Sequence, residues 1–191
     1  MTLTFQTKAQ GPKVAYLFPG QGAQAVGMGK ELYDHSAAAR EVFDEVDESL
    51  GRSLTKVLFE GPEDDLRQTI NAQPGIMAVS LACVKAMEEN LDLDEMPQPI
   101  VMAGHSLGEY SALVAAGAMT FREAVQAVHQ RGRFMQSAVP PGLGAMAAVI
   151  GLPVPPWLLN GANNDLNLNR TMTLNIVQLV QNSLDFWKKV R

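Results

Sequence analysis

The sequence predicts an α/β fold in which a parallel sheet is covered by helices. Two short apolar runs have the length of buried strands, Val14 to Phe18 and Ile100 to Ala103. Segments with helical periodicity separate them, and each run ends in a glycine-rich turn. Because strands that alternate with helices form parallel sheets, we expect these two strands to be adjacent, with both turns at the same carboxyl edge.

Helical patterns fill most of the chain between and after the strands. Asn71 and Pro74 mark the expected beginning of an apolar helix that is buried nearly all round. Thr120 and Glu123 form a capping box, which predicts a helix that continues to about Ala138. The helices are expected at 30–50, 53–59, 63–70, 75–90, 110–117 and 120–138.

Composition restricts the class of protein. With 191 residues, of which 47% are hydrophobic and 18% charged, the chain can form one globular core or one domain plus part of another. A net charge of -5 and the absence of a basic cluster argue against nucleic acid as a partner. The single cysteine, Cys83, excludes an intrachain disulfide and is expected to be a small buried hydrophobe.

No targeting or membrane segment is evident in the sequence. Residues 1–13 have neither an apolar core nor an arginine-rich amphipathic pattern. The longest weakly polar stretch, 143–159, is interrupted by glycines and prolines, so we do not expect it to span a membrane. A cytoplasmic protein is therefore expected.

The second strand leads into the pattern Gly104-x-Ser106-x-Gly108, and a helical segment follows directly. This strand-turn-helix context predicts a nucleophile elbow, in which the turn is so tight that only glycine fits two residues before and after the serine. The pattern alone occurs by chance in roughly one chain of this length in twenty or thirty, so the flanking strand and helix carry the prediction.

Two further groups of residues accompany the elbow. The loop Gly20 to Gln24 follows the first strand and would present backbone N–H groups to Ser106, although an ordinary turn has the same pattern. It lacks the lysine and hydroxyl residue of a phosphate-binding loop. The last helix carries His129, Arg131 and Arg133, which by spacing alone suit a solvated face. An arginine beside Ser106 could instead hold a substrate carboxylate through two parallel hydrogen bonds.

Four motifs together resemble the malonyl-CoA:acyl-carrier-protein transacylase family over about residues 12–152. They begin at Phe18 (FPGQG), Ala103 (AGHSLGEYS), Gln130 (QRGRFMQ) and Gly144 (GAMAAVIGL). The resemblance implies an α/β-hydrolase-like parallel sheet with a nucleophile elbow, followed by a ferredoxin-like subdomain that is incomplete here.

The resemblance also implies roles for individual residues. Ser106 would be the acylated nucleophile, and Arg131 would pair with the free malonyl carboxylate. The backbone N–H groups of Gln21 and Leu107 would form the oxyanion hole. His105 would not be the general base, because in the family a histidine well downstream of the elbow has that role. This chain has only His35, His105 and His129.

The resemblance divides the chain into an acyltransferase core and a tail that departs from the family pattern. The expected parts are a partial α/β core over 12–142 and the first strand of the small subdomain over 143–152. An asparagine-rich linker over 153–170 and an amphipathic helix over 171–191 would follow.

Malonyl transfer from coenzyme A to acyl carrier protein, in fatty-acid biosynthesis, is the activity that the resemblance implies. The coenzyme A thioester would be a substrate, with no permanently bound cofactor and no metal. A second chain could supply the missing half, which the sequence leaves open. The alternatives are a catalytically impaired fragment that acts as a binding module, and a serine hydrolase with His35 or His129 as its base.

Overall fold

A computed structural model describes residues 14–92 and 99–138 of the chain. All described residues lie in one compact unit of the chain, within Met1–Leu143. The expected strand at 143–152, linker at 153–170 and helix at 171–191 lie outside the described residues. None of the described helices combines the length and apolarity that crossing a bilayer requires.

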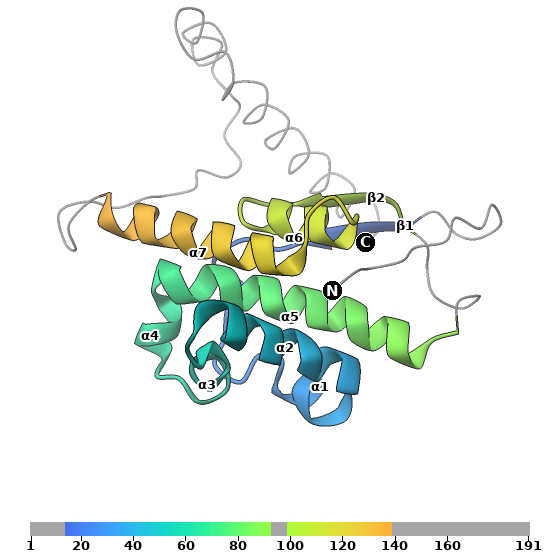
Figure 1. The fold of residues 1–191 in the computed structure, drawn as a ribbon, viewed down its shortest axis with the longest axis horizontal. Helices are drawn as coiled ribbons and strands as arrows, with labels where there is room; N and C mark the ends of the chain where they lie inside the picture. Colours follow the sequence, from blue (N-terminus) through green and yellow to red (C-terminus); the bar gives the residue numbers. More distant parts are fainter. Residues whose placement is uncertain (1–13, 93–98, 139–191) are drawn as a thin grey trace, which may run out of the picture. The chain divides into compact units, whose positions relative to one another are not determined.

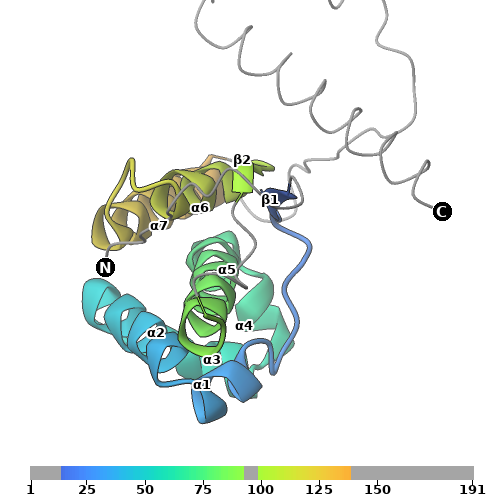
Figure 2. The same cartoon turned by 90° about the vertical axis from the view of Figure 1, so that its right-hand side faces the viewer.

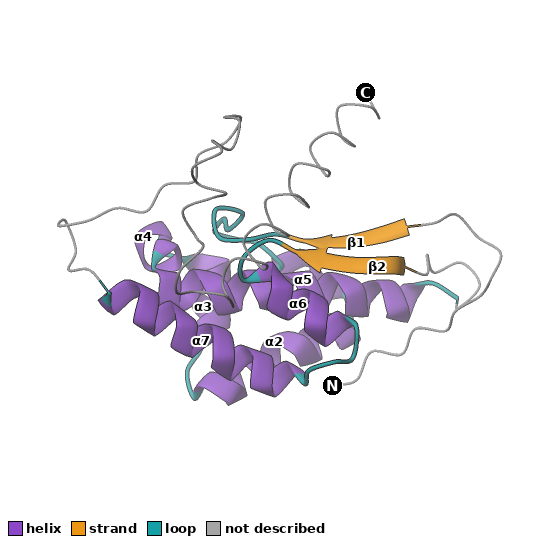
Figure 3. Cartoon of the chain, turned by 90° about the horizontal axis from the view of Figure 1, so that it is seen from above, coloured by secondary structure: helices purple, strands orange, loops and turns teal. Residues whose placement is uncertain are grey.

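Two strands, β1 (Val14–Phe18) and β2 (Pro99–Gly104), pair in parallel (Figure 3). Their register places Phe18 opposite Gly104, so both strands end at the same edge of the sheet, the carboxyl edge. This confirms the expected pairing. The glycine-rich loop and the serine turn therefore begin side by side.

The strands and helices follow one another in the expected α/β order. Helix α5 is the centre of the helical part: α2 and α7 both pack against it (Figure 1). In Figure 2, α6 and α7 lie on the strand side of α5, and α1 to α4 lie on the other side. The helices are α1 (Lys30–His35), α2 (Ala37–Leu50), α3 (Leu54–Glu60), α4 (Glu63–Arg67), α5 (Thr69–Asn90), α6 (Gly108–Ala115) and α7 (Phe121–Ser137).

The hydrophobic core lies where α2, α5 and α7 meet. Large apolar side chains from all three helices have no exposed surface there, including Phe43, Met77 and Phe121. Burial of each such side chain contributes roughly 1.5–3 kcal/mol, so this contact accounts for much of the folding energy. It also fixes α7 relative to α5, which matters for the site.

The expected helix over 30–50 is wrong at one point, because Ser36 divides it into α1 and α2. Ser36 is extended (φ -126°, ψ 121°), and its hydroxyl accepts a hydrogen bond from Ala39 N at 3.0 Å. The same hydroxyl donates to the carboxylate of Glu89 on α5. A serine that caps a new helix and bonds a distant carboxylate outweighs the local helical pattern.

The apolar helix also begins earlier than expected, at Thr69 rather than near Gly75, and Pro74 lies inside it. A proline has no N–H, so the carbonyl of Ile70 loses its usual helical donor. Arg52 replaces that donor: its Nη2 lies 3.5 Å from Ile70 O and 2.7 Å from Asn71 Oδ1. The side chain thus compensates for the proline and allows the helix to begin upstream of it.

Cys83 is exposed, contrary to the expectation of a buried residue. It lies on the half of α5 that is remote from Thr69, where the buried positions are interrupted. Partial desolvation raises the pKa of its thiol above the usual value. The segment around Cys83 is apolar on all sides, so its sequence did not predict which face of the helix the core covers.

The capping box at the start of α7 yields a first prediction, on stability. Thr120 Oγ1 accepts a hydrogen bond from Glu123 N at 3.3 Å, and Glu123 Oε2 accepts one from Thr120 N at 3.1 Å. Thr120→Ala should lower the free energy of unfolding by about 1 kcal/mol. Glu123 N would lose its acceptor, and the reciprocal bond from Thr120 N to the Glu123 carboxylate would lose its support. Thr120→Ser keeps the hydroxyl and should lose far less, as measured by urea unfolding followed by circular dichroism. Equal losses in the two variants would show that the cap contributes nothing.

Candidate active site

The turn after β2 has the geometry of a nucleophile elbow. Ser106 has φ 57°, and it is the only non-glycine residue with positive φ among those described. A Cβ on Gly104 would lie 1.9 Å from the carbonyl carbon of Gly108, so any side chain there would collide with the backbone. The two glycines therefore allow the chain to reverse tightly enough to hold Ser106 in a strained conformation.

The loop after β1 packs directly against this elbow. A Cβ on Gly108 would lie 2.3 Å from Phe18 O, and a Cβ on Gly20 would lie 2.5 Å from His105 Nδ1. His105 N also donates a hydrogen bond to Phe18 O at 3.0 Å. The glycine-rich loop and the serine turn thus meet at the carboxyl edge of the sheet, as the sequence predicts.

Arg131 on α7 reaches Ser106. Its Nη2 donates a hydrogen bond to Ser106 Oγ at 2.8 Å, and its Nη1 donates one to Gln73 Oε1 at 2.5 Å. Arg131 therefore does not simply point into solvent from a polar helix face, which was the alternative expectation. The structure brings together two of the four candidate site residues through a direct side-chain contact.

The neighbouring charged residues on α7 do not share this position. Arg133 donates to Gln130 on its own helix at 3.2 Å. Burial lowers the pKa of His129, and the charges of Arg52 and Arg133 lower it further. These two side chains fit the simpler expectation of a polar helix face.

Gln73 is a site residue that the sequence did not reveal. It comes from α5 and has no exposed surface. Its Oε1 accepts from Arg131, while its Nε2 lies 3.3 Å from Met135 Sδ. An amide that binds the guanidinium on one side and α7 on the other restricts Arg131 to one orientation. The only sequence signal is a polar residue in an otherwise apolar helix, which does not indicate a partner.

The contact of α7 with α5 is close because of Gly132. A Cβ at this position would lie 2.8 Å from Thr69 O and 3.0 Å from Ile70 Cα. The absence of a side chain brings the two helices together beside Arg131. Ile70 N also donates to Gln136 Oε1 at 3.3 Å, which joins the helices at a second point.

Gln21 belongs to the loop after β1, and Leu107 directly follows Ser106 in the turn after β2. Neither backbone N–H has an acceptor among the described residues. Leu107 is the capping residue at the beginning of α6, where N–H groups have no partner within the helix. The side chain of Gln21 donates to Thr69 Oγ1 at 3.2 Å, which ties its loop to α5.

No histidine is hydrogen-bonded to Ser106 within 14–92 and 99–138. His35 Nδ1 lies 2.9 Å from Glu31 O, on the helix that precedes α2. The described residues also contain no group of His, Cys, Asp or Glu side chains suited to a metal ion. The arrangement therefore offers a nucleophile and a cation, but it pairs the nucleophile with no base in the described part.

Comparison with known protein families matches residues 15–156 to the acyl transferase domain. A malonyl CoA-acyl carrier protein transacylase from Bacillus subtilis (strain 168) is 51% identical over 140 residues, which are 73% of this chain and 43% of the relative. The protein of that name from Escherichia coli (strain K12) is 44% identical over 138 residues, or 72% of this chain and 43% of the relative.

Solved structures of similar proteins agree with the observed fold. An acyl-carrier-protein-S-malonyltransferase from Bartonella henselae matches with a TM-score of 0.63 and 47% identity, over 68% of this chain and 41% of that one. A malonyl-transacylase in complex with a type II PKS acyl-carrier protein matches with a TM-score of 0.63 and 40% identity, over 69% and 41%. The chain thus spans less than half the length of these relatives.

The strained backbone at Ser106 yields a second prediction. Ser106→Gly and Ser106→Ala both remove the hydroxyl and its hydrogen bond with Arg131, so they differ only in the Cβ. At φ 57° the glycine variant should be more stable than the alanine variant by about 1 kcal/mol, because alanine keeps the left-handed strain. Urea unfolding measures the difference, and an alanine variant at least as stable as the glycine variant would rule out strain at this turn.

Proposed function

Because this chain belongs to the acyl transferase domain family, we propose that it binds malonyl-CoA and accepts the malonyl group on Ser106. The observation that carries the proposal is the 2.8 Å hydrogen bond between Arg131 Nη2 and Ser106 Oγ. It puts a planar cation beside a serine on a strained turn. That pair suits a substrate with a carboxylate at one end and an acyl carbon at the other.

In the proposed reaction, Ser106 Oγ attacks the thioester carbonyl of malonyl-CoA. The N–H groups of Gln21 and Leu107 donate to the oxyanion of the tetrahedral intermediate. Collapse of this intermediate breaks the carbon–sulfur bond, and coenzyme A leaves as a thiol with the proton that Ser106 Oγ gave up. The malonyl group remains on Ser106 as an ester, and no bound cofactor takes part because the thioester is itself the activated substrate.

Arg131 would change partners during this sequence. In the structure its guanidinium is shared between Ser106 and Gln73. When the malonyl carboxylate arrives, the Nη2 donor leaves the serine hydroxyl and forms one of two parallel bonds to the carboxylate. Gln73 retains the other side of the guanidinium, so the group need not reorient during binding.

The acceptor in the second half of the reaction is proposed to be acyl carrier protein, in fatty-acid biosynthesis. Its thiol would attack the ester on Ser106 by the reverse of the first step. The support is the similarity to proteins whose names include this carrier, among them the transacylase seen in complex with one. The chain spans 43% of the first of these relatives, so the proposal extends from part of the fold to the whole reaction.

Turnover is proposed to be slow for the described part alone. A serine hydroxyl is a weak nucleophile at neutral pH, and a positioned base contributes roughly 10²–10⁴-fold. Ser106 has no histidine partner among the described residues. This observation favours one alternative, a module that binds malonyl-CoA or a partner with little catalysis. It gives no support to a hydrolase that uses His35 or His129.

The third prediction concerns Ser106 itself. Incubation with malonyl-CoA should raise the intact mass of the chain by one malonyl group, slowly, because the oxyanion donors and binding alone can retain about 10³–10⁴-fold over water. Ser106→Ala should show no gain, whereas His129→Ala should be acylated as fast as the natural chain. Acylation that disappears in the histidine variant would identify His129 as the base. A mass gain that survives in Ser106→Ala would place the ester elsewhere.

The fourth prediction concerns selection of the acyl group. Arg131→Ala should cost on the order of 2–5 kcal/mol in malonyl binding or transfer, because a desolvated carboxylate loses its paired charge. Arg131→Lys keeps the charge without the planar fork and should recover only part of the loss. Acetyl-CoA, which has no carboxylate, is the matched substrate and should be affected far less. Equal losses for the two thioesters would assign Arg131 a structural role.

A further inference from the structure

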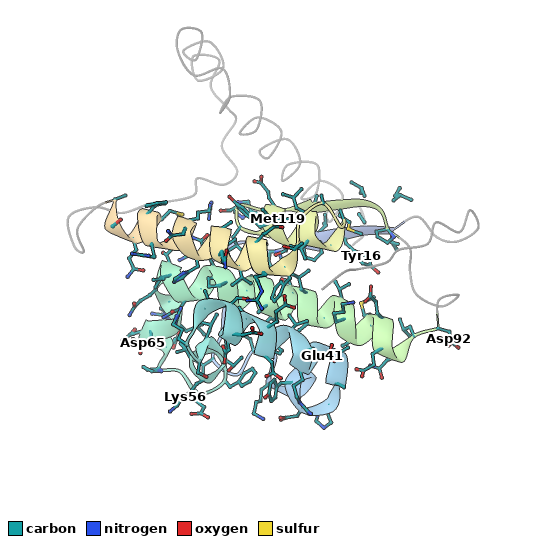
Figure 4. All side chains as sticks on the ribbon, in the orientation of Figure 1. Tyr16, Glu41, Lys56, Asp65, Asp92 and Met119 are labelled. Atoms are coloured by element: carbon teal, nitrogen blue, oxygen red, sulfur yellow. The ribbon has the colours of Figure 1, made fainter. Side chains whose placement is uncertain are left out.

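The strand that precedes the glycine-rich loop is well anchored. Phe18 and Tyr16 both pack against the hydrophobic core, and Figure 4 shows Tyr16 between β1 and the helical layer below it. A Cβ on Gly108 would lie 2.3 Å from Phe18 O and 2.8 Å from Pro19 O, so the elbow contacts the backbone as far as Pro19. The chain therefore enters the loop from a fixed point.

The loop itself, Gly20 to Gln24, has few backbone hydrogen bonds. Among the described residues, Gly22 N is the only backbone N–H of the loop with an acceptor, and this acceptor is the side chain of Gln24 at 2.7 Å. Residues 21–23 are exposed, and Gly22 has φ 110°, which favours glycine. The position of Gln21 N–H thus depends chiefly on side chains that contact the loop.

His105 makes the first of these contacts. Gly20 is buried, although its two neighbours in the chain are exposed. A Cβ on Gly20 would lie 2.5 Å from Nδ1 and 3.3 Å from Cε1 of His105, so the imidazole occupies the place of a side chain at this position. The backbone of His105 is itself fixed, because its N–H donates to Phe18 O at 3.0 Å and its carbonyl accepts from Gly108 N at 2.9 Å. The elbow therefore holds the ring against the loop.

Thr69, the first residue of α5, makes a second contact with the loop. Its Oγ1 accepts a hydrogen bond from Gln21 Nε2 at 3.2 Å. This bond is exposed to water, which competes for both partners, so we expect it to hold the loop less firmly than the imidazole does. The loop is thus attached to two elements, to the elbow through His105 and to α5 through Thr69.

We propose that His105 is a positioning residue, whose imidazole holds the loop so that Gln21 N–H points at the oxyanion formed during acylation of Ser106. The inference rests on the proposed function for the role of Gln21 as a donor. Such a donor acts within about 2.7–3.1 Å of the developing charge, and loss of one donor costs about 10²–10³-fold in rate. The imidazole has this effect through packing and transfers no proton.

The first measurement is of the loop and needs no catalysis. Backbone NMR relaxation gives the order parameter of Gln21 N–H in the complete chain. It should be about 0.85 in the natural chain, as in rigid backbone, and should fall below about 0.6 in His105→Ala. The loop would then lose the contact that covers Gly20.

The second measurement is the rate of acylation of Ser106 at increasing concentrations of malonyl-CoA, followed by intact mass. His105→Ala should lower the rate constant at saturation by at least about tenfold, because a displaced donor stabilises the oxyanion less. The concentration at half-saturation should stay the same, since Arg131 keeps its contacts with Ser106 and Gln73. A general loss of structure would instead change both quantities.

Three further variants make the test specific. His105→Phe replaces the imidazole by another planar ring and should keep most of the order and of the rate, which a role in proton transfer would not allow. His35→Ala is the matched control, because His35 is an exposed histidine on α1, and it should change neither quantity. Thr69→Val removes the second contact and should lower both by a smaller factor. Circular dichroism of each variant checks that its helices remain folded.

The outcomes separate this proposal from the proposed function. An unchanged order parameter of Gln21 N–H in His105→Ala would overturn the proposal, and so would an unchanged rate constant of acylation. Equal losses in His105→Phe and His105→Ala would also overturn it, because the ring nitrogens would then matter and not the packing. A natural chain that malonyl-CoA does not acylate would overturn the proposed function, while the order parameters still decide whether His105 holds the loop.

Discussion

The closeness of two glycines is the constraint on which the site depends. Gly104 and Gly108 approach so nearly that a Cβ on the first would lie 1.9 Å from the backbone of the second, and this contact forces Ser106 to positive φ. Gly108 also lies against the carbonyl of Phe18, so the same contact fixes the loop after β1. Strain at one residue is maintained because the surrounding backbone leaves it no other conformation.

A second close approach, between α5 and α7, sets the position of the cation. Gly132 brings the two helices together, and the buried amide of Gln73 then fixes the guanidinium of Arg131. Neither contact involves the elbow, yet together they hold Arg131 Nη2 at 2.8 Å from Ser106 Oγ. The position of the site thus depends on two close backbone approaches within the fold, one at the elbow and one between α5 and α7.

Sequence patterns were sufficient where the determinant is local. The strands, the elbow and the capping box at Thr120 each depend on residues a few positions apart, and the structure contains all of them. The errors arose where a distant residue decides. Glu89 stabilises the break at Ser36, Arg52 compensates for Pro74, and Arg131 gives buried Gln73 its role. The pattern of apolar residues within one segment cannot predict which residue 18 to 58 positions away will form a hydrogen bond with it.

The proposed reaction has two requirements, recognition of the substrate carboxylate and activation of the serine, and the described part of the chain meets them unequally. The proposed recognition of a carboxylate would use Arg131 and its support on α5, both of which lie among the described residues. Activation of the serine needs a base, and Ser106 has none among the described residues. The sheet that carries the serine is also the element whose outer face is open. Because β2 leads directly into the turn at Ser106, the position of this serine depends on the stability of the two-stranded sheet.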